Sequence, residues 1–219
     1  MRPLPYKFSN GAQVLGAYKI AQVSGALAAT PTALDAWARI RWPAPTVGGA
    51  KLVLCRLEAG LSVSGAVTTL IQFSLDAIIA RGFTVDFDTA ITNISMAGDT
   101  GKMHRNMRTS LMGTAGPGIS TTTVMSGQTY NLDGAPFAIQ DYPMITAVTA
   151  TGTAIAGAVG VMSGMKDLYR WDGLGDHPPT LSDLEGIVVR CRLTGHATGT
   201  LALRTVWHWA EVINPFNND

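Results

Sequence analysis

The sequence is poor in charged residues. Asp, Glu, Lys and Arg make up 14% of its 219 residues, against about 25% in an ordinary soluble domain. A solitary soluble chain usually carries more charge on its surface, so this composition is typical of a protein that packs against other protein. The formal net charge of +1 at pH 7 argues against a nucleic-acid partner, because binding nucleic acid requires an excess of positive charge.

Cysteine and histidine are also scarce, and their spacing matches no common metal motif. Cys55 and Cys191 lie far apart in the sequence, in segments that alternate like strands. We interpret them as buried thiols, with a disulfide between two strands as the alternative. The four histidines have no paired ligand spacing. We therefore expect neither a metal nor a cofactor.

Catalytic motifs are missing as well. The sequence contains neither a G-x-S-x-G nucleophile elbow nor a Walker A loop. Asp86 and Asp88 would lie on one side of an extended segment and could hold a divalent cation, although a solvated strand end fits better. Asp172 and Asp176 flank two glycines in a loop, too few ligands to argue for calcium. We predict that the protein is not an enzyme.

One uncharged stretch, residues 144–165, is long enough to cross a bilayer. It consists mainly of Ala, Gly and Thr, which contribute little free energy to membrane insertion. We therefore predict two buried strands joined by a turn of small residues, with a membrane or fusion segment as the alternative. No membrane partner is expected. The first residues lack the apolar stretch of a secretory signal, which indicates assembly in a cytoplasm.

Short alternating segments separated by turn residues dominate the rest of the chain. Alternation with a period of two is typical of strands. Strands are predicted over residues 13–23, 34–42, 51–58, 65–81, 119–126, 187–194 and 200–212. The last two are expected to form an antiparallel hairpin, and residues 166–183 a long surface loop. The predicted fold is all-β, an antiparallel β-sandwich of the jelly-roll type.

The alternation also predicts which side chains face the core. In residues 34–42, Ala36, Ala38, Ile40 and Trp42 would share one face, and Trp37 and Arg39 would lie on the other. The strand over residues 51–58 should end before Gly60. In the last strand, Trp207 and Trp209 are expected in the core.

Residues 100–112 are the exception to this pattern. Met103, Met107 and Leu111 recur every four residues, which predicts a short helix packed over the end of a sheet. Lys102, His104, Arg105 and Arg108 form a basic cluster off this stripe, interpreted as a solvated face or a patch for an acidic neighbour. The domain organisation predicted for the chain is an extended arm over residues 1–9, one β-sandwich over 10–213 and a tail over 214–219.

Four phrases carry a resemblance to a known family. They are IARGFT at residues 79–84, MRTSLM at 107–112, LDGAPF at 132–137 and WAEV at 209–212. Their order is similar to that in a family of tailed-bacteriophage virion structural proteins, over roughly residues 35–212. The resemblance implies a decoration or cement protein of the virion that binds the major capsid protein lattice and associates as a dimer or trimer. It carries over no functional residue.

Interface positions are suggested by the terminal segments, the basic cluster and isolated tryptophans, since aromatics and Arg are enriched at interfaces. The candidates are Arg2, Tyr6, Phe8, Trp37, Arg105, Arg108, Trp171 and Phe216. The arm and the tail are expected to tie neighbouring subunits together. The alternative function is a receptor- or carbohydrate-binding module of a tail or head fibre, with Tyr169 and Trp171 in a loop groove.

Overall fold

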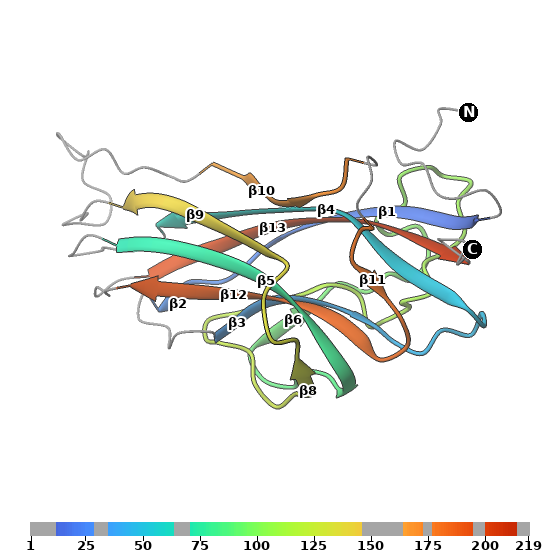
Figure 1. The fold of residues 1–219 in the computed structure, drawn as a ribbon, viewed down its shortest axis with the longest axis horizontal. Helices are drawn as coiled ribbons and strands as arrows, with labels where there is room; N and C mark the ends of the chain where they lie inside the picture. The colour runs from blue at the N-terminus through green and yellow to red at the C-terminus, as the bar shows by residue number, and fades with distance from the viewer. Residues whose placement is uncertain are drawn as a thin grey trace.

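The computed structural model describes residues 12–28, 35–63, 71–145, 164–172, 177–194 and 200–213. In these ranges the chain forms β-strands joined by turns, without a helix. The strands build two antiparallel sheets that pack face to face around a shared apolar layer (Figure 1). The prediction of an all-β antiparallel sandwich is therefore confirmed.

In Figure 1, β10, β4, β13 and β1 of the first sheet cross the upper part of the view, and β12, β3, β6 and β8 of the second sheet lie below them. The first sheet runs in the order β1 (Gln13–Val23), β13 (Thr200–Ile213), β4 (Ala50–Val63) and β10 (Lys166–Arg170), with β2 (Leu27–Ala28) paired to β13 and β11 (Thr180–Leu181) paired to β4. The second runs in the order β6 (Ile91–Asn93), β7 (Gly118–Ser120), β3 (Asp35–Trp42), β12 (Glu185–Thr194), β5 (Ile71–Val85) and β8 (Thr129–Leu132), with β9 (Ala138–Ile145) also paired to β5.

The longer strands pair in a nested way. β1 pairs with β13, β3 with β12, β4 with β10, and β5 with β9. The pairs β1–β13 and β4–β10 belong to the first sheet, and the pairs β3–β12 and β5–β9 belong to the second. The chain therefore changes sheet between β1 and β3, and again between β12 and β13. The predicted hairpin of the last two strands is wrong, because β12 lies in the second sheet and β13 in the first. Both strands turn an apolar face to the same core, which gives them the alternation of a hairpin without the pairing.

Large aromatic side chains fill the space between the sheets. Trp207 and Trp209 from the first sheet and Trp42 from the second are at most 1% exposed, so the prediction that Trp207 and Trp209 belong to the core is confirmed. Tyr142 reaches across from β9 and donates its hydroxyl hydrogen to the carbonyl oxygen of Ala59 on β4, at 2.9 Å. Burial of such rings supplies most of the free energy that holds the layers together.

A bulge in β3 corrects the predicted faces of this strand. The pairing of β3 with β12 shifts between Val189 and Arg190, whose partners are Ala38 and Ala36. Trp37 is the extra residue, so it enters the core together with Ile40 instead of lying opposite to it. Ala36 packs instead in the cluster on the outer face of the second sheet.

Several predicted boundaries also change. β4 continues through Gly60 to Val63, because Gly60 pairs with Arg204 in the middle of the sheet. The strand predicted over residues 119–126 is only β7, and the loop predicted over 166–183 contains β10 and β11. Residues 146–163, which make up most of the uncharged stretch, lie outside the described residues, as do the arm over residues 1–9 and the tail.

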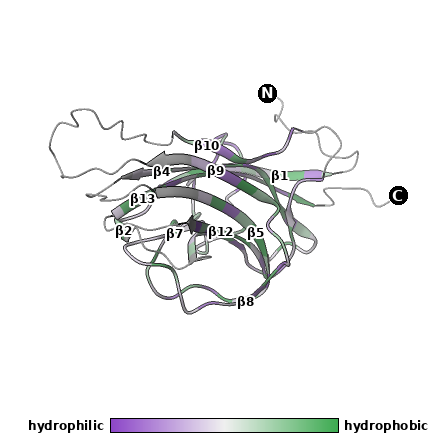
Figure 2. Ribbon diagram, turned by 60° about the vertical axis from the view of Figure 1, so that its left-hand side comes forward, coloured by the Kyte–Doolittle hydropathy of each residue, from purple (hydrophilic) through white to green (hydrophobic). Residues whose placement is uncertain are grey.

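The segment between β5 and β9 covers the face of the second sheet that points away from the first. In both ribbon views, β8 lies on this side (Figures 1 and 2). Phe83, Phe87 and Tyr130 form a T-shaped aromatic cluster there, with ring centroids 4.9–5.8 Å apart. Arg41 of β3 lies over the Phe83 ring, 5.5 Å from its centroid. The second sheet is therefore buried on both faces over much of its area.

Residues 94–116 close one end of the sandwich, and the helix predicted over 100–112 is wrong. These residues form turns, and Gly101 and Gly113 have positive φ angles of 69° and 57°, which a right-handed helix does not contain. Their backbone bonds to β1 instead, since the N–H of Lys19 donates to the carbonyl oxygen of Gly101. Met112 remains a core residue, 2% exposed, whereas Met103 is 48% exposed.

The two ends of this segment lie close together, which predicts that Gly116→Ala lowers stability. A Cβ atom at Gly116 would lie 1.9 Å from the carbonyl oxygen of Ile94 and 2.7 Å from Cγ of Met96. We expect a loss of about 2 kcal/mol in the free energy of unfolding, measured by chemical denaturation. Gly134→Ala is the control, because no heavy atom lies within 4 Å of its added Cβ; equal stability of the two variants would contradict this packing.

Candidate functional site

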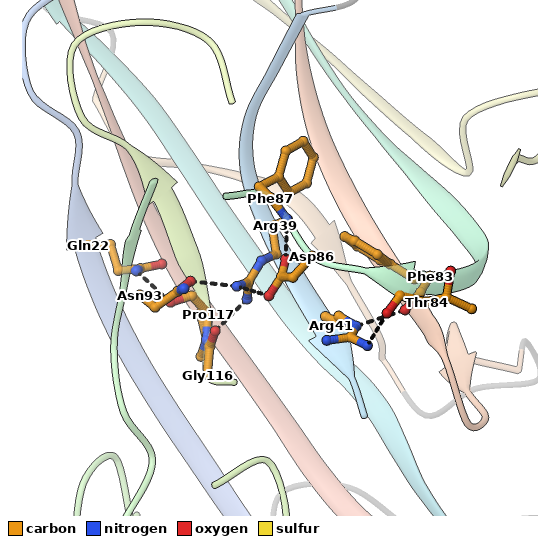
Figure 3. A network of polar contacts seen from close by, with 10 residues as sticks. All are labelled: Gln22, Arg39, Arg41, Phe83, Thr84, Asp86, Phe87, Asn93, Gly116 and Pro117. Carbon is orange, nitrogen blue, oxygen red and sulfur yellow. Dashed lines mark hydrogen bonds and ion pairs between the residues drawn. The ribbon is translucent and has the colours of Figure 1, made fainter. Parts of the chain in front are cut away.

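A buried arginine joins the second sheet to the segment that covers it. Arg39 lies on the outer face of β3, as the alternation predicted, and its guanidinium makes three contacts (Figure 3). It donates hydrogen bonds to the carbonyl oxygen of Gly116, the carboxylate of Asp86 and the side-chain oxygen of Asn93. Asp86 also accepts a hydrogen bond from the backbone N–H of Phe87, at 2.8 Å. One side chain thus fixes three separate points of the covering segment.

The electrostatics of this network follow from its burial. The Arg39 side chain is fully buried, and Asp86 is 20% exposed. Burial lowers the pKa of Arg39 to about 10, although the Asp86 carboxylate acts in the opposite direction. The guanidinium therefore remains charged at neutral pH and depends on its partners for compensation. It is not accessible to a substrate, so its role is to hold the fold together.

Neighbouring hydrogen bonds extend this connection to the first sheet. Gln22 of β1 donates from Nε2 to the carbonyl oxygen of Pro117, at 2.9 Å (Figure 3). The backbone N–H of Gly25 donates to the carbonyl oxygen of Ser120 on β7, at 3.3 Å. The edges of the two sheets are thus bridged on this side of the sandwich.

Asp86 and Asp88, the candidate cation pair, have separate roles: Asp88 is exposed, as the interpretation of a solvated strand end predicted, whereas Asp86 is only 20% exposed. Asp86 pairs with Arg39, and Asp88 accepts a hydrogen bond from the hydroxyl of Thr89. Within the described ranges, His, Cys, Asp and Glu form no group of three or more that could hold a metal ion. Asp176, the second loop carboxylate considered above, lies outside these ranges.

A second buried ion network lies further along the second sheet. Asp76 of β5 is fully buried and accepts two hydrogen bonds from Arg190 of β12, at 2.8 and 2.7 Å, and one from Arg192, at 2.9 Å. Asp76 alternates with the core residues Leu75 and Ala77, and Arg190 follows the core residue Val189, so these side chains leave the sheet on its outer face. Only the register, in which Arg190 lies directly opposite Asp76, could have shown that they meet.

The closed end of the sandwich contains a buried carboxylate. Glu211 of β13 accepts hydrogen bonds from the Ser110 hydroxyl and from the backbone N–H of Leu111. Burial raises the pKa of Glu211, and these two hydrogen bonds oppose the rise. Beside it, the Tyr18 hydroxyl donates to the carbonyl oxygen of Arg108, at 2.7 Å. Burial and the charge of Glu211 both raise the pKa of Tyr18.

The basic cluster predicted from the sequence lies on this closing segment. Arg105 and Arg108 are exposed, in positions that a partner could reach. Lys102 is paired with Asp99, its Nζ lying 2.7 Å from Oδ1. The backbone N–H of Asn106 donates to Nδ1 of His104, which supports a turn. Two of the four cluster residues therefore contribute to local structure, and the two arginines remain the interface candidates.

The other candidates fall into three groups. Trp37 is fully buried between the sheets, which puts it out of reach of a partner. Arg2, Tyr6, Phe8 and Phe216 lie outside the described residues. Trp171 is 6% exposed and forms one wall of a hollow of about 350 Å³ together with Tyr169.

Both cysteines are buried thiols, as the preferred interpretation of the sequence had it. Cys55 lies on the outer face of the first sheet and Cys191 in the core. Burial raises the pKa of Cys55, which keeps it protonated and poorly reactive at neutral pH.

The Arg39 network predicts that Arg39→Met strongly destabilises the protein. The substitution introduces an apolar side chain of similar length, but it leaves Asp86, Asn93 and the Gly116 carbonyl without their donor. We expect a loss of about 3 kcal/mol in the free energy of unfolding, from denaturant titration. Arg81→Met, which removes a half-exposed arginine paired with Asp133, should cost less than about 1 kcal/mol. A small effect of Arg39→Met would show that the network contributes little.

The Glu211 site predicts a pH-dependent gain from Glu211→Gln. Because the folded pKa is raised, the protonated form is favoured in the fold, and this stabilisation is lost as the pH rises through the folded pKa. A glutamine can still accept from Leu111 and donate to Ser110. The melting temperature of the Glu211→Gln variant should exceed that of the parent chain by a few degrees at neutral pH. The difference should vanish below about pH 4.3, the ordinary glutamate pKa.

Glu58→Gln is the matched control for this measurement, because Glu58 lies on the outer face of the first sheet and pairs with Arg56 at 3.1 Å. It should show no gain at neutral pH. A melting temperature of Glu211→Gln below that of the parent at every pH would contradict a raised pKa at Glu211.

In the described part of the chain, no helix is long and apolar enough to cross a membrane. A scan against protein-family models gives no match, and a search of curated proteins gives none either.

Proposed function

We propose that the protein is a non-enzymatic structural subunit of a tailed-phage particle, a decoration or cement protein that binds the major capsid protein lattice and stabilises the head. The observation that carries this proposal is the nested pairing of the strands. In order along the chain, β1, β3, β4, β5, β9, β10, β12 and β13 pair first with last and inward from there. A long hairpin rolled into two sheets has this pattern, which supports the jelly roll, an architecture common among viral capsid domains.

The distribution of charge supports an assembling protein. Arg39, Asp76, Arg190 and Glu211 are all buried in networks that hold the fold together. In a chain with so few ionised side chains, each charge used inside the fold leaves less charge on the surface. A weakly charged surface favours association with other protein over independent dispersal.

The outer face of the first sheet offers a surface for such contacts. Ala21 of β1 is exposed and lies opposite Val206 of β13. Val23, two residues further along β1, is 58% exposed. Lys19, two residues before Ala21, and Arg204, opposite Val23, are exposed on the same face, so it offers a neighbouring subunit apolar side chains and hydrogen-bond donors together. We infer that this face contacts the head lattice. Copies of the chain associate on the lattice as dimers or trimers.

Binding to heads tests this proposal directly. Purified chain is mixed with phage heads that lack it, and the bound fraction is measured by co-sedimentation and by imaging of the particles. We expect saturable binding at positions that follow the lattice symmetry. Val23→Asp should weaken it about tenfold, since it places a charge in the contact.

Val85→Asp is the control variant. Val85 is 49% exposed and belongs to the second sheet, so its substitution should leave head binding unchanged. A chain that sediments as a monomer and never enters particles would overturn the proposal. Equal loss of binding in both variants would place the contact elsewhere.

A further inference from the structure

A hollow of about 350 Å³ opens beside β10. Its walls come from three parts of the chain: Phe137, just before β9; Tyr169 and Arg170 in β10 with Trp171 and Asp172 after it; and His177 and Pro179, just before β11. Its volume lies at the lower end of the range of about 300–1,000 Å³ found for small-molecule sites.

Two of these three parts are attached to the same central strand. The backbone N–H of Trp171 donates to the carbonyl oxygen of Cys55, and the backbone N–H of Leu54 donates to the carbonyl oxygen of Pro179. Cys55 and Leu54 are neighbours on β4, which pairs with β13 along its whole length. The backbones of Trp171 and Pro179 are therefore fixed by the first sheet, and that of Phe137 by the second, because its N–H donates to the carbonyl oxygen of Ala77 on β5.

Aromatic rings form the apolar part of the lining. Phe137 and Tyr169 meet edge to face, with centroids 5.5 Å apart and an interplanar angle of 84°. Both are only partly buried, and Trp171 lines the same hollow. A ligand placed here would meet ring surface on one side, which favours a partner with a flat C–H face.

Polar groups of mixed character form the rest of the lining. Arg170, whose side chain is 67% exposed, supplies only donors, and Asp172 supplies acceptors. His177 can do either. An anionic ligand would meet the Asp172 carboxylate, and a cationic one the Arg170 guanidinium. A neutral ligand with several hydroxyl groups can donate to the one and accept from the other.

We propose that this hollow binds a terminal sugar unit of a neutral glycan. A sugar ring combines a C–H face, which stacks on the Tyr169 ring, with hydroxyls that bond to Asp172, Arg170 and His177. The site does not rest on the proposed role in the virion, because its geometry belongs to the isolated chain.

The test begins with an array of immobilised neutral oligosaccharides, bacterial cell-surface glycans included. Each bound sugar is then titrated in solution while the indole N–H signals of the tryptophans are followed by NMR. We expect at least one sugar to bind with a Kd of about 1 mM or tighter and to shift the Trp171 signal, assigned with the Trp171→Phe variant.

Asp172→Asn and Tyr169→Ala should each weaken this binding about tenfold, since each removes one part of the lining. Asp99→Asn is the matched control, because Asp99 is an exposed carboxylate on the closing segment at another part of the molecule, and it should bind as the parent does. Circular dichroism verifies that Tyr169→Ala folds. Asp172→Asn, the milder change, decides the question where it does not.

Failure of every sugar to shift a tryptophan signal at about 10 mM would overturn the inference. Binding that survives unchanged in Asp172→Asn would also overturn it, by placing the sugar elsewhere. A chain that binds sugar here but never binds heads would leave this inference standing and overturn the decoration role. Binding to heads without sugar binding would do the reverse.

Discussion

The apolar layer between the two sheets constrains the rest of the molecule. Trp37, Trp42, Trp207 and Trp209 are at most 1% exposed, so each long strand must present an apolar face inward along its length. A charge can enter only where hydrogen-bond donors compensate it, and Glu211 does so at the closed end of the sandwich. The closing segment, residues 94–116, is thereby fixed by the contacts of Ser110 and Leu111 with Glu211 and by Met96 and Met112 in the core.

The exclusion of solvent also determines where charged residues lie on the outer face of the second sheet, where the covering segment packs on it. Arg39 and Asp76 are each fully buried, because the chain between β5 and β9 and the neighbouring side chains exclude solvent from that face. Their partners are supplied by a strand neighbour or by the covering segment, and removal of Asp86 or Asp76 would leave a buried arginine without its carboxylate. The outer face of the first sheet is different, because Lys19, Ala21, Val23 and Arg204 are exposed on it.

The sequence predicted the strands well because their periodicity is local. The bounds of β1 agree fully, and those of β3, β12 and β13 agree to within two residues. Pairing was not predictable in this way, because β12 and β13 alternate alike whether they form a hairpin or face each other across the core. The bulge at Trp37 and the contact of Asp76 with Arg190 depend on register, which a single strand does not encode. The helix over residues 100–112 failed because its methionine spacing was read without the positive-φ glycine at 101.

The hollow shows how a site arises from this architecture without a sequence motif. Its residues come from segments far apart in the chain, and β4 brings them together because it pairs with β10 and β11 on one edge while β13 pairs along the other. Neither the aromatic pair nor the polar groups would be adjacent if β10 were the loop that the sequence predicted. The strands that form the core thus also fix the backbones of Trp171 and Pro179 in the lining. The polar side chains stay at the surface, where they can adjust to a ligand.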